Sequence, residues 1–308
     1  MNRIKKALYD LARNDAKKYL TNNLGIVVEE DDRLICYVEK SRVKKKNYRY
    51  TIACLGIGKE KYRKEMAKKF QLDKPICYVI DGLELKRNNV YIFGYDDCEV
   101  IIKNCNFELN YFIHIHVNGK CTLDNTDIKS FSNLSISANE LIIKNIRDNQ
   151  IEILDSKSNI GFGANRIDVI DSNIGSKKKN IKASFLATNE LNITNSNISG
   201  KEVECEADII NIDEKSSLTA TNKVSLKTNE FDPITINAPI IALNGDEMIN
   251  KKGKAVLKKI TNSIDLKRIE LINLLRKAKE KCELLNAENV SEYEEELDVY
   301  PISRILKR

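Results

Sequence analysis

Glu140-Leu141-Ile142-Ile143-Lys144-Asn145 is one copy of a short pattern that returns through the middle of the chain. Each copy places a few alternating apolar residues before an Asn, Asp or Ser, and the pattern then breaks. The other copies are Glu99–Asn104, Cys121–Asn125, Arg166–Asp171 and Glu190–Asn195. Their polar ends fall at 104, 125, 145, 171 and 195, so the steps are 21, 20, 26 and 24 residues. This period with strand-like content predicts a solenoid, in which each turn buries its apolar face by stacking on its neighbours.

The strands of such a solenoid are too short to be stable alone, so we expect them to stack in register as a parallel β-helix. About seven turns would give a rod roughly 35 Å long at the usual strand spacing. Asn and Asp tolerate tight turns and bond to nearby backbone, so the polar ends are expected at the corners, where their amides can form a ladder. The pattern resembles the right-handed parallel β-helix proteins of the pectate-lyase-like group. That resemblance covers about 170 residues and implies a fold rather than an activity.

Alignment of the copies on their polar ends predicts which side chains point inward. The apolar residues at alternate positions share one face of each strand. The predicted core positions are Val100, Ile102, Leu123, Leu141, Ile143, Ile167, Val169, Leu191 and Ile193.

Charge and composition divide the chain of 308 residues into three parts. Residues 1–74 carry 20 Lys and Arg against 10 Asp and Glu, and read as a small basic α+β domain. It has a helix expected at 3–20, strands at 26–29, 33–39 and 48–55, and a second helix at 59–70. Residues 75–250, with 17 basic against 25 acidic residues, form the predicted parallel β-helix, and its repeat closes at the turn Asn244-Gly245. The fold class is therefore mainly β, with an α+β head and a helical tail at 251–308.

The tail is expected to be one long helix from Lys254 to about residue 287. Leu257, Ile264, Leu271, Ala278 and Leu285 are each seven residues apart, which indicates a coiled-coil seam, although Lys267 and Lys281 interrupt it. The seam would make the protein a homo-oligomer. The alternative is that the apolar stripe packs on the protein's own solenoid or head domain, and we favour this covering role.

The two histidines of the chain, His114 and His116, are the candidate metal ligands. Both lie on one predicted strand face, while Ile113, Ile115 and Val117 point to the other. Two imidazoles on one face can bind a metal if a third ligand joins them, such as Asp96, Asp97 or Asp127. The alternative is an exposed strand face with two polar residues. We expect no cofactor.

Lys44, Lys45 and Lys46 form the candidate anion-binding site. We expect them in an exposed loop beside Tyr48 and Tyr50, and lysines near aromatic rings can hold a nucleic acid or another anionic polymer. Solvated lysines without a ligand are the alternative. The turn Gly56-Ile57-Gly58-Lys59 lacks the full spacing of a phosphate-binding loop.

Catalytic residues are not identified by any motif. The galacturonase branch of the resembled group carries N-T-D, then D-D, G-H-G and R-I-K. This chain has Asn125-Thr126-Asp127 and Asp96-Asp97 in the reverse order and no G-H-G. The eight cysteines include no C-x-x-C pair, and several lie in apolar runs, so we expect reduced, buried thiols in the cytoplasm. No apolar run reaches the length of a transmembrane span.

Three hypotheses for function follow. The first is a non-enzymatic cytoplasmic scaffold or assembly protein built on the β-helix. The second is a protein that binds or cleaves polysaccharide, which would need a groove of acidic and aromatic residues along one solenoid face. The third is a binder of anionic surfaces or nucleic acid through the basic residues 1–74, whose binding would weaken steeply with salt.

Overall fold

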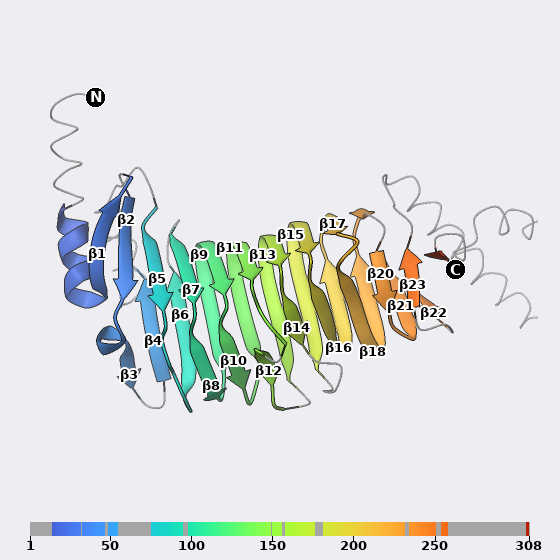
Figure 1. Cartoon of the computed structure of the whole chain (residues 1–308), viewed down its shortest axis with the longest axis horizontal. Coiled ribbons are helices and arrows are strands. Elements are labelled where there is room, and N and C mark those ends of the chain that lie inside the picture. The colour runs from blue at the N-terminus through green and yellow to red at the C-terminus, as the bar shows by residue number, and fades with distance from the viewer. Residues whose placement is uncertain are drawn as a thin grey trace, which may run out of the picture.

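The computed structural model is a parallel β-solenoid of about seven turns with a short helix at its N-terminal end (Figure 1). It describes residues 14–31, 33–46, 49–54, 75–94, 98–148, 150–155, 158–175, 181–231, 234–250, 254–257 and 306–307. A helix spans 14–23 and buries Ala16 and Leu20, which agrees with the later part of the helix expected at 3–20. The expected helix at 59–70 lies outside the described residues.

Three faces run along the solenoid, and parallel strands follow one another on each. Face A contains β4 (Arg49–Cys54), β6 (Asn89–Gly94), the first halves of β9 (Ile113–Asp124), β11 (Leu134–Lys144), β13 (Asn159–Ile170) and β15 (Lys182–Thr194), the second halves of β16 (Asn197–Glu206) and β18 (Ser217–Lys227), and β21 (Ile240–Leu243).

Face B follows face A along each turn. It contains β2 (Arg33–Val38), β5 (Cys77–Asp81), β7 (Glu99–Lys103), the second halves of β9, β11, β13 and β15, β17 (Ile209–Ile212) and β19 (Glu230–Phe231). Face C completes each turn with β8 (Asn106–Asn110), β10 (Asp127–Ser130), β12 (Ile151–Ile153), β14 (Asn173–Gly175), the first halves of β16 and β18, and β20 (Ile234–Asn237).

Antiparallel strands lie at both ends of the stack. At the N-terminal end β1 (Gly25–Glu30) pairs with β2, and β3 (Lys44–Lys46) pairs with β4 after a short 3-10 turn at Lys40–Arg42. At the C-terminal end β22 (Asp246–Ile249) pairs with β21, β23 (Lys254–Leu257) with β20, and β24 (Leu306–Lys307) with β23. The strands β2 and β4 pair in parallel with β5 and β6, so the stack of parallel strands includes residues from 33 onward.

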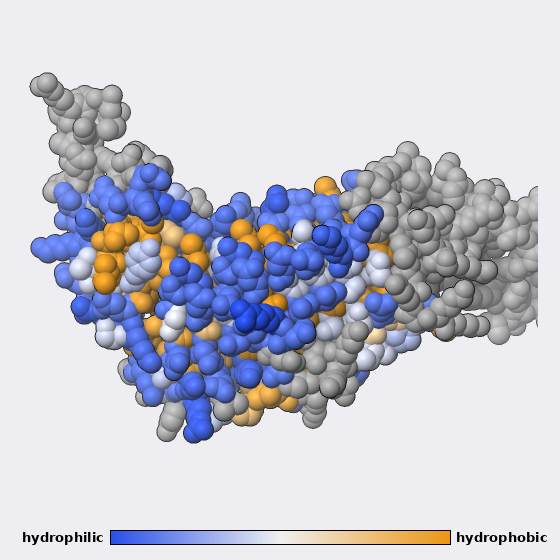
Figure 2. Space-filling model, in the orientation of Figure 1, coloured by the Kyte–Doolittle hydropathy of each residue, from blue (hydrophilic) through white to orange (hydrophobic). Residues whose placement is uncertain are grey.

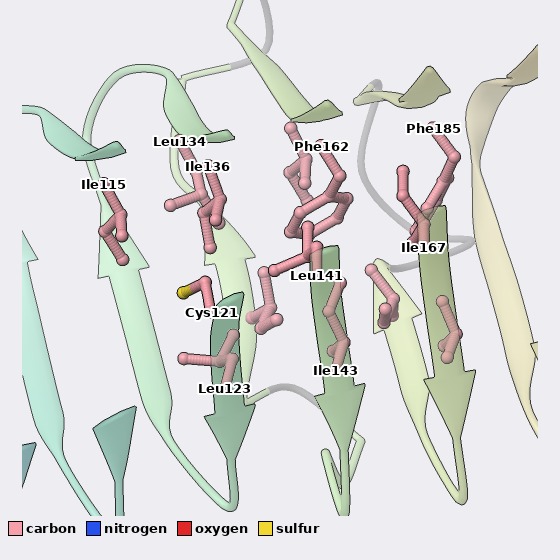
Figure 3. Packing of buried hydrophobic residues seen from close by; sticks show 14 of the residues in the cluster. Ile115, Cys121, Leu123, Leu134, Ile136, Leu141, Ile143, Phe162, Ile167 and Phe185 are labelled. Atoms are coloured by element: carbon pink, nitrogen blue, oxygen red, sulfur yellow. The ribbon is translucent and has the colours of Figure 1, made fainter. Parts of the chain in front are cut away.

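The predicted core register is confirmed. All nine positions aligned from the sequence are at most 1% exposed and belong to one hydrophobic cluster. Figure 3 shows four of them, Leu123, Leu141, Ile143 and Ile167, among other buried residues of the stack such as Phe162 and Phe185. Cysteine side chains are also buried, as expected of small apolar residues: they belong to Cys36, Cys77, Cys98, Cys105, Cys121 and Cys205. Burial raises the pKa of Cys121 and of Cys205 to about 12, so these thiols stay protonated.

The predicted polar corners are confirmed as well. Asn104, Asn125, Asn145, Asp171 and Asn195 all have left-handed backbones, with φ between 43° and 57°. Their side chains form part of a ladder between turns: Asn125 Nδ2 donates to Asn104 Oδ1 at 2.9 Å, and Asn195 Nδ2 donates to Asp171 Oδ1 at 2.6 Å. A second, buried ladder follows one residue later, where the Ser172 and Ser196 amides donate to Ser196 Oγ and Ser216 Oγ, each at 2.9 Å.

Face B carries two outward columns in which acidic and basic residues alternate from turn to turn. One column is Asp81, Lys103, Asp124 and Lys144, with ion pairs of 3.3 Å between Asp81 and Lys103 and between Asp124 and Lys144. The other is Glu99, Lys120, Glu140, Arg166 and Glu190, in which Arg166 is 3.0 Å from Glu190. Opposite charges on adjacent strands stabilise the pairing, whereas like charges oppose it.

Two expectations about local structure are wrong. Lys254–Leu257 is the strand β23 rather than the start of a long helix, because these residues pair with the edge of β20. Leu257, the first residue of the expected seam, therefore belongs to a sheet, and the later seam residues lie outside the described residues. Lys44–Lys46 is the strand β3 rather than a loop, because its backbone pairs with β4. The turn at Asn244-Gly245 is confirmed: both residues have positive φ and connect the antiparallel strands β21 and β22.

Candidate interaction surface

Aromatic rings gather on the outer side of face A at β6 and β9. The alternation of these strands sends Tyr91, Phe93, His114 and His116 outward and their neighbours into the core. The rings of Phe112 and His114 are stacked 6.0 Å apart, and Phe93 lies 5.9 Å from His114. We call these five rings the ring rows: Tyr91, Phe93, Phe112, His114 and His116. They project outward from the N-terminal part of face A.

The histidines share one strand face, as the alternation predicts. Their rings are 6.4 Å apart and nearly parallel, and His116 Nδ1 shares a hydrogen bond with Ser137 Oγ at 2.7 Å. Burial and the neighbouring His116 lower the pKa of His114, which favours a neutral ring. Within the described residues no three His, Cys, Asp or Glu side chains converge on one point. Asp96 and Asp97 lie outside those residues, so the metal site stays a prediction.

Beyond the ring rows, the outward positions of β11 and β13 that are in register with His114 and His116 hold only serine and glycine. Register pairs His114 with Ser135 and His116 with Ser137. The next strand places Gly161 and Gly163 beside these serines, and Ser184 follows Gly161. We call Ser135, Ser137, Gly161 and Gly163 the small-residue strip. Ser184, beyond Gly161, is buried and donates its hydroxyl to Glu204 at 2.9 Å.

The fold itself does not require the two glycines of the strip. Neither has a positive φ. A Cβ built on Gly161 would have Leu134 O at 3.9 Å as its nearest neighbour, and one on Gly163 would have Leu186 O at 4.0 Å, both ordinary contacts. Glycine inside a strand is unfavourable by about 0.5–1 kcal/mol and often marks a place where a ligand or another backbone approaches closely. Sequence reasoning missed this site, although the alternation in Ile160-Gly161-Phe162-Gly163 places both glycines on the outer side.

Exposed apolar side chains border the strip on two further sides. Tyr111, Phe131 and Leu154 follow β8, β10 and β12 at the corner that leads into face A, and are 57%, 44% and 39% exposed. The rings of Tyr111 and Phe131 are 6.0 Å apart. Leu186, two residues after Ser184, is 45% exposed. Exposed apolar residues that cluster in this way are typical of a contact surface.

A second apolar patch lies on the edge strands at the N-terminal end. Ile26 is 58% exposed, and Val28 and Tyr37 are each 39% exposed. Figure 2 shows apolar residues gathered over β1 and β2, whereas hydrophilic residues cover most of the rest of that side. The two apolar surfaces differ in one respect. Of the two, only the strip on face A combines exposed apolar residues with glycines, Gly161 and Gly163, whose backbone conformation and surroundings would accept a side chain.

Acidic side chains gather in a different place, in a hollow of about 450 Å³ on face B. Asp168 accepts from Asn192 Nδ2 at 2.7 Å and from Arg166 Nε, and Asn192 in turn accepts from Asn211 at 2.8 Å. Glu190 lies in the same hollow. The polysaccharide hypothesis expected acidic and aromatic residues in one groove. In the described part of the chain the hollow has no aromatic lining and the ring rows are on another face.

The basic candidates lie at the N-terminal end of face A. Lys45 Nζ is 5.4 Å from the centre of the Tyr50 ring, and the Arg49 guanidinium is 5.6 Å from the centre of Tyr91. The cation–aromatic proximity expected around Lys45 is thus present, while anion binding by Lys44, Lys45 and Lys46 stays a prediction. No helix among the described residues is long and apolar enough to cross a membrane. Comparisons with protein-family models, curated proteins and solved structures found no match.

Proposed function

We propose that this protein is a non-enzymatic cytoplasmic scaffold that uses the rigid solenoid to present face A to a partner. The observation that carries the proposal is the small-residue strip, with its two unneeded glycines and its border of exposed apolar side chains. A flat, side-chain-poor surface admits close approach of another protein surface, and aromatic residues are enriched in protein interfaces. The proposal includes a right-handed coil, as the resemblance to the pectate-lyase-like group implies.

The electrostatics of the solenoid favour a structural role for its charges. Among the described acidic residues, each resolved pKa shift is downward: a hydrogen bond from Asn104 lowers the pKa of Asp81, and hydrogen bonds from Lys86 and Lys182 lower those of Glu108 and Glu204. A general acid at neutral pH needs a raised pKa instead. These carboxylates therefore serve as charged partners that hold neighbouring turns together.

The test compares the strip with the acidic hollow. In an extract of the cells that make the protein, the wild-type chain should sediment in an assembly larger than its 35.2 kDa mass, and Gly163→Leu should release it. Asp168→Asn, the control in the hollow, should leave the assembly unchanged. A wild-type chain that sediments alone would overturn the proposal. So would turnover of a polysaccharide by the purified protein that Asp168→Asn abolishes.

A further inference from the structure

From the outward residues at the N-terminal end of face A, we infer that this end binds a single-stranded nucleic acid, with its bases on the ring rows and its phosphates on the basic strands before them. The site lies outside the small-residue strip, so it adds a second ligand to the proposed scaffold. Among the described strands of face A, basic and aromatic positions adjoin where β3 and β4 meet β6 and β9. Proteins that bind single strands without sequence preference combine these two features.

Basic residues occupy the first strands of the face. Arg49 is exposed, and its guanidinium lies 5.6 Å from the centre of the Tyr91 ring. Register sets Lys46 opposite Arg49. It sets Lys44 opposite Thr51, two residues further along β4, so all three basic positions are on one side of the sheet. This row beside the rings matches the negative charge of a nucleic acid backbone.

Acidic residues are missing from the outward positions of the strands that form the site. Along face A, these positions of β4, β6, β9 and β11 hold arginine, threonine, alanine, asparagine, histidine, serine and aromatic residues. Face B differs, because acidic residues such as Asp81 and Asp124 alternate with basic ones along its columns. A phosphate chain therefore meets attraction at this end of face A and alternating repulsion on face B, whereas a neutral polysaccharide gains nothing from the basic row.

The spacing of the rings suits an extended single strand. Tyr91 and Phe93 are 6.1 Å apart, and His114 and His116 are 6.4 Å apart. Both spacings exceed the rise of about 3.4 Å between stacked bases in a duplex strand. The rings of each row are nearly parallel to one another and so present their edges outward. A base that lies flat across these edges makes edge-to-face contacts, which aromatic rings prefer over a face-to-face sandwich.

The small number of contacts predicts weak binding that depends on salt. Each cation that neutralises a phosphate of a single strand contributes about −0.7 to the slope of log K against log salt, so the basic row predicts a slope of about −2. Stacking on aromatic side chains adds a contribution that salt does not remove. Loss of the base contacts should therefore weaken binding by at least about tenfold at any salt concentration.

A tryptophan placed in the ring rows reports base contact at that position, because the chain contains no tryptophan of its own. Phe93→Trp exchanges one aromatic ring for another, and His114→Trp puts a second reporter on β9. Titration of each purified full-length variant, with circular dichroism like that of the wild type, with an oligothymidylate of about twelve nucleotides should quench the fluorescence to saturation. Tyr37→Trp is the matched control, because Tyr37 is 39% exposed on β2 of face B. Its fluorescence should not change.

Further variants separate the phosphate contacts from the base contacts. Arg49→Ala, added to Phe93→Trp, should weaken binding and reduce the salt slope by about 0.7. Arg147→Ala removes an exposed arginine between β11 and β12, at the corner of faces B and C, and should change neither quantity. An abasic oligomer with the same number of phosphates should bind at least about tenfold more weakly than the oligothymidylate. Gly163→Leu should leave oligonucleotide binding unchanged, so the nucleic acid site and the proposed scaffold can fail separately.

Three results would overturn the inference. The first is a labelled oligonucleotide that binds, as measured by fluorescence anisotropy, without quenching either tryptophan in the ring rows, which would place binding elsewhere in the basic residues 1–74. The second is the absence of oligonucleotide binding at low salt. The third is equal quenching by an uncharged oligosaccharide, which would favour the polysaccharide hypothesis instead.

Discussion

Replacing Asn125 by alanine and by glycine separates two reasons for an asparagine at the corner. Asn125 has φ 43°, its Nδ2 donates to Asn104, and its Oδ1 accepts from Gln150 at 3.3 Å. Both substitutions remove two largely exposed hydrogen bonds, together about 1 kcal/mol. Only alanine adds the strain of a left-handed backbone, about 1–2 kcal/mol. We therefore expect losses of about 1 kcal/mol for Asn125→Gly and about 2–3 kcal/mol for Asn125→Ala.

Urea unfolding followed by circular dichroism measures the global loss. Hydrogen exchange of the β9 and β11 amides shows whether the neighbouring turns loosen locally, as a solenoid allows. Asn118 is the matched control, because it is an exposed asparagine within β9 without a positive φ. There the order should reverse, since glycine in a strand is worse than alanine by about 0.5–1 kcal/mol. The reasoning is refuted if Asn125→Gly destabilises as much as Asn125→Ala.

Three further predictions concern the core, the charges and the C-terminal end. Leu191→Ala should lower the free energy of unfolding by about 2–5 kcal/mol, because Leu191 is fully buried; a loss below about 1 kcal/mol in urea titrations would contradict the register. A hydrogen bond from Lys182 lowers the pKa of Glu204. The pair between these two residues therefore stabilises the fold at neutral pH, and this stabilisation is lost as the pH falls through the folded-state pKa of Glu204. Glu204→Gln should therefore narrow the stability difference between neutral and acidic pH, and an unchanged thermal-melt profile would show that the pair contributes nothing. Truncation after Gly253 should cause aggregation, measured by light scattering, because it removes β23 from the edge of β20. Truncation after Leu257 keeps that edge paired and is the control. Equal aggregation of both truncated chains would show that β23 does not protect the edge.

The features that were predicted correctly are those set by local chemistry. Alternation within one strand fixes which side of the sheet each residue occupies, so Leu191 and the outward His114 followed from the sequence. The corners also followed, because asparagine is among the few residues that tolerate a left-handed backbone. The 26-residue step before Asp171 did not obscure the register, since each copy could be aligned on its own polar end.

The features that were missed depend on pairing between distant segments. Lys44–Lys46 and Lys254–Leu257 are strands because β4 and β20 offer them free edges, and neither segment carries that information in its own residues. The small-residue strip has a similar origin. Gly161 is unremarkable within β13 and becomes part of a surface only when the register places it between Ser135 and Ser184.

The alternating charges on face B restrict which duplications of turns can lengthen such a solenoid. Along the column Asp81, Lys103, Asp124 and Lys144, duplication of a single turn would place two like charges on adjacent strands. Duplication of two consecutive turns would preserve the alternation on both sides of the insertion. The charge pattern of this rod thus repeats every two turns, whereas the backbone repeats every turn. We expect related proteins with longer or shorter solenoids to differ from this one by an even number of turns in this region.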